Sequence, residues 1–202
     1  MKFTSPPHDE SLSRGLKSAE ERSDYSVYTW QVGKGSHLAL FPNLNASDNE
    51  WRRLMRDVRF RRALSLSIDR DEINKALYYG LAMPAQNTML PDSPLFKPAY
   101  KDAWAKLDID QANRLLDEIG LTKRNKRGVR LLSDGRPLEI IVETAGENTE
   151  EPDVLQLIQD NWRKARIKLH VKPSHRDVLR NRIYSGATVM AISSGWENAL
   201  AN

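Results

Sequence analysis

Apolar and polar positions recur along this chain with two different periods, and the changes of period predict where strands and helices lie. Alternation over residues 25–31 and 37–41 is typical of strands, and the glycine-rich turn at 33–35 between them predicts an N-terminal hairpin. Residues 1–24 are polar and contain prolines, so we expect a loosely ordered leader there.

From Glu50 the period of the apolar positions becomes helical. We expect a helix over 50–68, and then a second helix that begins at an N-cap, Asp69, and ends at Gly80. Residues 81–98 contain four prolines and predict an extended surface crossing. A third helix is expected to begin at Asp110, as its N-cap, and to end at Gly120.

The second half of the chain alternates strands with helices. The Asp-Gly pair at 134–135 predicts a hairpin turn between strands over 128–132 and 138–144. After it we expect, in order, a helix to Arg166 with Pro152 in its first turn, a strand over 167–171, a helix over 173–184 and a buried central strand over 188–193. This order indicates an α/β fold with a mixed sheet flanked by helices.

Composition excludes several classes of protein. Of 202 residues, 40% are hydrophobic and 29% charged, which is typical of a globular chain and not of a disordered one. No apolar run approaches the ~18 residues needed to span a bilayer. The absence of cysteine excludes disulfides, thiolate metal sites and a cysteine nucleophile. Polar residues follow Met1, so no secretory signal is expected in this chain.

The net charge of +4 is mild, but the positive charge is concentrated in two windows. Residues 52–62 hold six arginines against one aspartate, and residues 123–130 hold five lysines and arginines without an acid. Such windows are typical of solvated surfaces, and they are also typical of nucleic-acid-binding modules. The arginines of 52–62 fall on several sides of the expected helix, which argues against a face that reads a groove.

No catalytic constellation is recognisable. The four histidines (His8, His37, His170 and His175) lack metal-ligand spacing, and no Gly-x-Ser-x-Gly elbow occurs. The acidic pairs 117–118 and 150–151 fall on faces expected to be exposed. We therefore expect no enzyme, no metal and no cofactor; catalysis by Glu197 or a histidine is the weaker alternative.

Five segments together resemble a known family. Residues 58–73 read VRFRRALSLSIDRDEI, and residues 79–84 read YGLAMP. Residues 110–121 read DQANRLLDEIGL, residues 134–140 read DGRPLEI, and residues 162–168 read WRKARIK. In this order and spacing they resemble the extracytoplasmic solute-binding proteins, family 5, the peptide- and oligosaccharide-type binding components of ABC importers.

The resemblance implies a fold, a partner and a location. It implies a lobe of the type II periplasmic-binding-protein fold and capture of an oligopeptide or oligosaccharide between two lobes. It also implies delivery of that solute to an ABC permease from the periplasm. Residues 25–202 align with the C-terminal lobe only, so we expect a truncated piece of a larger protein whose N-terminal lobe lies elsewhere. The resemblance gives no role to nucleic acid.

The resemblance also suggests ligand-binding residues. In peptide-binding members a strand corresponding to 188–193 leads into a loop whose aromatic residue packs on the ligand and whose aspartate pairs with its ammonium group. Here Trp196 matches the aromatic residue, and Glu197 and Asn198 stand where the aspartate is expected. An indole beside such polar groups also suits a sugar. Asn45 and Arg182 are further ligand-binding candidates.

Overall fold

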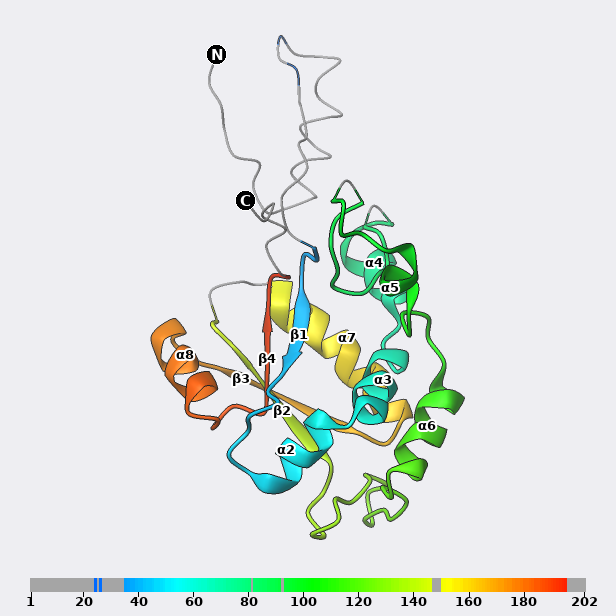
Figure 1. Cartoon of the computed structure of the whole chain (residues 1–202), viewed down its shortest axis with the longest axis vertical. Helices are drawn as coiled ribbons and strands as arrows, with labels where there is room; N and C mark the ends of the chain where they lie inside the picture. Colours follow the sequence, from blue (N-terminus) through cyan, green and yellow to red (C-terminus); the bar gives the residue numbers. More distant parts are fainter. Residues whose placement is uncertain are drawn as a thin grey trace. The chain divides into compact units, whose positions relative to one another are not determined.

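The computed structural model describes Asp24, Ser26 and residues 35–80, 82–91, 93–146 and 150–195 (Figure 1). Chain contacts separate residues 1–33 from residues 34–202, and almost all of the described residues belong to the second unit. Most of the expected leader over 1–24 and of the expected strand over 25–31 lies outside the described residues, so the N-terminal hairpin stays a prediction.

A four-stranded mixed sheet forms the centre of this unit. The strands are β1 (Ala39–Pro42), β2 (Glu139–Thr144), β3 (Lys168–Pro173) and β4 (Met190–Ser193), in the order β1-β4-β2-β3. β1 runs antiparallel to β4, whereas β2 is parallel to both β4 and β3. The predicted mixed sheet is therefore confirmed, with β4 as an inner, largely buried strand.

Helices lie on both faces of the sheet, as Figure 1 shows. They are α2 (Asn49–Arg56), α3 (Val58–Leu66), α4 (Arg70–Leu77), α5 (Pro98–Asp102), α6 (Ile109–Glu118), α7 (Glu150–Lys164) and α8 (Arg176–Tyr184). On β2, Ile140 and Val142 point to the face that α7 covers, whereas Glu143 points to the opposite face and bonds Arg182 of α8. No helix among the described residues is long and apolar enough to cross a membrane.

The main core lies between the sheet and α7. Leu155, Ile158 and Trp162 recur along one stripe of α7 and are buried, as the helical period predicts. The Trp162 ring is fully buried, and its Nε1 donates to the carbonyl oxygen of Leu64 at 3.1 Å. This bond ties α7 to α3, so the helices and the sheet share one core.

Aspartate side chains begin several of the helices, and they correct two of the predicted boundaries. The single helix expected over 50–68 is divided into α2 and α3, because Asp57 leaves the helical conformation and accepts a hydrogen bond from the Arg59 amide at 2.8 Å. The N-cap of α6 is Asp108, which accepts from the Gln111 amide at 2.8 Å, and not the predicted Asp110. The predicted cap Asp69 is confirmed, since it accepts from the Glu72 amide at 2.9 Å.

The hairpin predicted around residues 134–135 is only half right. The turn forms, with the Gly135 amide bonded to the Leu132 carbonyl at 3.0 Å. The segment 128–132, however, makes isolated bridges and no strand of the sheet. Arg130 lies in this segment; its guanidinium is fully buried, bonds carbonyls and pairs with Asp117, and so holds the segment against α6.

Candidate functional site

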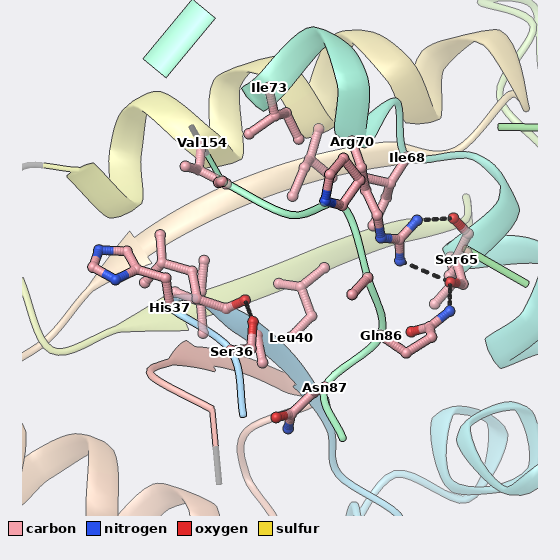
Figure 2. Close-up of a pocket in the computed structure, with 18 of the residues that line it drawn as sticks. Ser36, His37, Leu40, Ser65, Ile68, Arg70, Ile73, Gln86, Asn87 and Val154 are labelled. Atoms are coloured by element: carbon pink, nitrogen blue, oxygen red, sulfur yellow. Dashed lines mark hydrogen bonds between the residues drawn. The ribbon is translucent and has the colours of Figure 1, made fainter. Parts of the chain in front are cut away.

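A cavity of about 470 Å³ opens beside the sheet, between β1 and β4 on one side and α3, α4 and α7 on the other (Figure 2). This volume lies within the range of small-molecule sites, ~300–1,000 Å³. The segment 82–87, which follows α4, contributes the remaining wall. Because these elements are far apart in the sequence, no single motif could indicate the cavity.

Most of the wall is apolar. The side chains come from strands, from helices and from the segments next to them: Leu38, Leu40, Leu64, Ile68, Ile73, Val154, Ile158, Trp162, Met190 and Ile192. Leu40 and Ile192 are cross-strand partners on the same face of the sheet, which places them side by side in the wall. Figure 2 shows Leu40, Ile68, Ile73 and Val154 converging on the same space.

A polar cluster occupies one end of the cavity. Arg70 donates from Nη1 to the carbonyl oxygens of Ser65 and Ala105, at 3.0 and 2.8 Å, and from Nη2 to Ser65 Oγ at 2.9 Å. Gln86 donates to the same Ser65 Oγ at 2.7 Å. Burial lowers the pKa of the Arg70 guanidinium to about 10. The sequence pattern does not indicate this cluster, although Arg70 stands inside the family-like segment 58–73.

The opposite end of the cavity carries a histidine. His37 Nε2 lies 2.9 Å from Glu150 Oε2, and the Tyr78 hydroxyl bonds the other oxygen of the same carboxylate. The His37 and Tyr78 rings meet edge to face, with centroids 5.7 Å apart. These contacts tie the segment before β1 to the end of α4 and the start of α7.

The segment after β4 contacts residues that line the cavity. The Gly195 amide donates to the Ser36 carbonyl oxygen at 2.8 Å. A Cβ at Gly195 would lie 2.5 Å from the Ser36 nitrogen and 2.6 Å from Asn87 Oδ1, so only glycine fits here. Ser36 and Asn87 both line the cavity. The predicted ligand residues Trp196, Glu197 and Asn198 follow at once, but they lie outside the described residues.

The candidate Asn45 lies at the other end of β4. Pro42 is opposite Met190, so the loop after β1 adjoins the start of β4 and not its end at Ser193. Asn45 is exposed, accepts a bond from Arg56 Nη2 at 3.1 Å, and donates from its amide to Asn43 Oδ1 at 2.9 Å. These contacts fix the loop after β1 against α2.

Arg182 forms an ion pair within the lobe. Its Nε and Nη2 donate to the two carboxylate oxygens of Glu143, at 2.7 and 2.8 Å. Burial by itself would raise the pKa of Glu143, but the paired Arg182 guanidinium, with smaller effects of Lys172 and Thr188, lowers the pKa overall. Both Asn45 and Arg182 therefore stand near the turn before β4, and β4 separates them from Gly195.

The arginines of the first basic window contact neighbouring groups of the same chain, whereas four of the five cations in the second window are exposed. Every arginine in 52–62 has a partner within the chain: Arg52 at the Ala46 carbonyl, Arg53 at Glu50, Arg56 at the Leu44 carbonyl, Arg59 at Asp57, Arg61 at the Met55 carbonyl, and Arg62 over the Trp104 ring. In the second window Arg130 is buried. Within the described part of the chain, no three metal-ligating side chains gather in one place.

Comparisons with known proteins identify the class of protein that carries this fold. A family model, bacterial extracellular solute-binding proteins, family 5 Middle, matches residues 10–201. A probable ABC transporter-binding protein of Deinococcus radiodurans is 29% identical over 154 residues, which cover 76% of this chain and 23% of that protein. A solved oligopeptide-binding protein OppA is 33% identical, with a TM-score of 0.85, over 94% of this chain and 30% of that one.

A more distant solved structure, MelB of Agrobacterium fabrum in complex with stachyose, shares the fold. It is 16% identical with a TM-score of 0.66, over 90% of this chain and 29% of that one. The unit thus has the type II periplasmic-binding-protein-like fold. The chain belongs to the bacterial extracellular solute-binding proteins, family 5. It spans less than a third of the length of each of these three relatives.

Proposed function

We propose that this chain is one lobe of the solute-binding component of an ABC importer, and that the complete protein binds an oligopeptide in the periplasm. The observation that carries the proposal is the family match over residues 10–201, together with a 33% identical relative named an oligopeptide-binding protein. The proposal includes no catalytic step, because the family that matches residues 10–201 is described as one of solute-binding proteins.

The mouth of the cavity is the side of the lobe that faces the solute in this proposal. Gly195 is fixed against Ser36 and Asn87, so the chain leaves β4 at a defined point. The next residue, Trp196, is assigned the role of stacking on the solute. Glu197 and Asn198 are assigned the polar contacts, with the Glu197 carboxylate pairing with a peptide ammonium group.

Asn45 and Arg182 receive a supporting role in the proposal. Their side chains are engaged with Arg56 and Glu143, and both lie towards the start of β4. Fixing that end of the strand positions Gly195 at the other end. This division of roles is part of the proposal. It is supported by the bonds that Asn45 and Arg182 make within the chain, and it assigns ligand contact to the three residues after Gly195.

An oligosaccharide is the less favoured solute. The structure with bound stachyose is only 16% identical to this chain, which supports a common fold and no more. The relative with the name of an oligopeptide-binding protein is 33% identical. An indole and two polar side chains suit both ligands, so the choice rests on this difference in similarity.

Calorimetry tests the proposal with two forms of the protein. Since one lobe supplies only one side of a closed cleft, the 202-residue chain is expected to bind no peptide or oligosaccharide with a Kd in the micromolar range. The product of the complete reading frame is expected to bind oligopeptides at micromolar Kd. Micromolar binding of a panel member by the 202-residue chain would contradict the two-lobe argument.

Substitution of the stacking residue tests the assigned site in the same complete product. Trp196→Ala is expected to weaken oligopeptide binding by about tenfold or more, because a buried aromatic anchor contributes more than ~1 kcal/mol. The matched control is Trp104→Ala, an indole that lies under Arg62 and does not line the cavity. An equal loss of oligopeptide affinity in both variants, or no loss in either, would show that Trp196 does not contact the solute.

A further inference from the structure

The cavity beside β1 has a charge pattern that the proposed solute cleft does not explain. Two guanidinium groups, Arg61 and Arg70, line it, and among the described residues no aspartate or glutamate does. Arg61 donates to the Met55 carbonyl at 2.5 Å, and Arg70 bonds only carbonyl and hydroxyl oxygens. Neither cation has an anionic partner within the described part of the chain.

Arg70 also retains donors. A guanidinium has five N–H groups, and the described residues accept from three of those of Arg70. Its Nε and the second hydrogen of Nη2 therefore remain for a ligand. A desolvated cation with spare donors in a planar fork is suited to a carboxylate, which accepts two parallel hydrogen bonds.

The rest of the cavity determines what this carboxylate is attached to. Figure 2 shows the Arg70, Ser65 and Gln86 cluster at one end, and the apolar side chains Leu40, Ile73 and Val154 beyond it. Among the described lining residues there is no carboxylate to pair with an ammonium group, since Glu150 contacts His37 and Tyr78 but does not itself line the cavity. Sugar hydroxyls would be buried without partners against the apolar side. An apolar tail can lie against these walls without leaving a polar group buried and unpaired.

We propose that this cavity binds a small monocarboxylate with an apolar tail, with the carboxylate at Arg70 and the tail between β1, α4 and α7. The site lies wholly within the described lobe. It is therefore expected to work in the 202-residue chain, and it does not depend on the two-lobe function proposed above.

The first test compares two probes of the same shape, octanoate and octanamide, by calorimetry on the 202-residue chain at neutral pH. Octanoate is expected to bind at least about tenfold more tightly, because its charge-assisted bonds to a guanidinium are stronger than those of a neutral amide. Equal affinity for the two probes, or no binding of octanoate, overturns the proposal without any variant.

Two substitutions then locate the site. Arg70→Met is expected to abolish the preference for octanoate over octanamide. Arg59→Met, the control, is expected to keep it, since Arg59 pairs with Asp57 outside the cavity. Leu40→Trp, which fills the apolar part of the cavity, is expected to weaken the binding of both probes by about tenfold or more.

Leu40→Trp also keeps the location testable if Arg70→Met does not fold, as judged by circular dichroism. Octanoate binding that survives Leu40→Trp unchanged in a folded chain overturns the assignment to this cavity. A preference for octanoate that survives Arg70→Met in a folded chain overturns the role of Arg70.

Discussion

Asp48 shows how one side chain serves two structural tasks in this lobe. One of its oxygens accepts from the Glu50 and Trp51 amides, at 3.0 and 3.1 Å, and so begins α2. The carboxylate also pairs with Arg136 from the turn before β2, at 2.8 and 3.1 Å. The pKa of Asp48 is lowered to about 2, chiefly by the bond from Arg136 and to a smaller extent by these amide bonds.

This lowered pKa predicts a pH dependence of stability. Because the pKa of Asp48 is lower in the folded chain than the value of about 3.9 in an unfolded one, its contribution is complete above about pH 4 and is lost as the pH falls towards 2. Asp48→Asn keeps an acceptor for the amides but loses the charge. The variant should be less stable at pH 7 by about 1 kcal/mol or less, since the pair is partly exposed.

Urea denaturation at pH 7, 4 and 2.5 measures the effect. The difference in midpoint between the Asp48→Asn variant and the parent chain should shrink between pH 4 and 2.5. The control is Asp177→Asn, because the nearest side-chain nitrogens of His175 and Arg180 are 4.0 Å from the Asp177 carboxylate. This variant should show a smaller difference at pH 7. A difference for Asp48→Asn that stays constant over this pH range would contradict the argument.

At the scale of elements, the turn between α8 and β4 sets the position of the central strand. The Gly186 carbonyl accepts from the Ser47 amide at 2.8 Å, and the Asn43 side chain donates to carbonyls on both sides of the turn. A Cβ at Gly186 would lie 2.7 Å from the Asn45 carbonyl oxygen, and φ is +79°. The turn thus requires glycine for two independent reasons.

A pair of variants separates these two reasons. Gly135 has φ +88°, and a Cβ added there would meet nothing within 4 Å, so Gly135→Ala carries only the backbone strain of about 1–2 kcal/mol. Gly186→Ala adds a clash with backbone and should cost roughly 1–3 kcal/mol more. Urea midpoints of both variants give the difference, and equal losses would show that the close approach at Gly186 is not rigid.

The elements that the sequence predicts well are those with a long, regular period. α7 repeats its apolar stripe along its whole length, with Pro152 in its first turn as predicted, and it ends two residues before the predicted Arg166. The break at Asp57 could not be predicted, because a single aspartate inside a helical period has no distinct signal until its side chain is seen to cap α3. Segment 128–132 alternates like a strand, yet the buried bonds of Arg130 keep it out of the sheet.

The cavity is less predictable than the elements that surround it. Leu40, Arg70 and Ile192 come from three distant parts of the chain, and only the sheet register and the packing of α4 bring them to one space. The family resemblance indicates the residues that follow β4, because these are carried by a local motif. Gly195, the last described residue before that motif, lies against Ser36 and Asn87, and both of these residues line the cavity.

At the scale of the whole molecule, the distribution of charge predicts how the chain meets polyanions. The net charge is only +4, and two of the six arginines of 52–62, Arg53 and Arg59, are already paired with carboxylates. A module that contacts six to ten phosphates loses roughly 10³–10⁵ in affinity between 50 and 200 mM salt. We expect this chain to show no such slope.

A gel-shift titration tests this at low salt, with a random-sequence DNA duplex and a single-stranded RNA. No retardation by this chain is expected up to protein concentrations of about 10 μM at 50 mM salt. A true nucleic-acid-binding module would be detected under these conditions, because such modules reach Kd values of roughly 1–100 μM even at physiological salt and bind more tightly at lower salt. The variant Arg56→Gln with Arg59→Gln, which removes two charges from the window, should behave like the parent chain. Retardation that depends steeply on salt and is weakened in this variant would instead establish residues 52–62 as a nucleic-acid-binding surface. The salt slope should then be smaller in the variant, because the slope is proportional to the number of phosphate contacts.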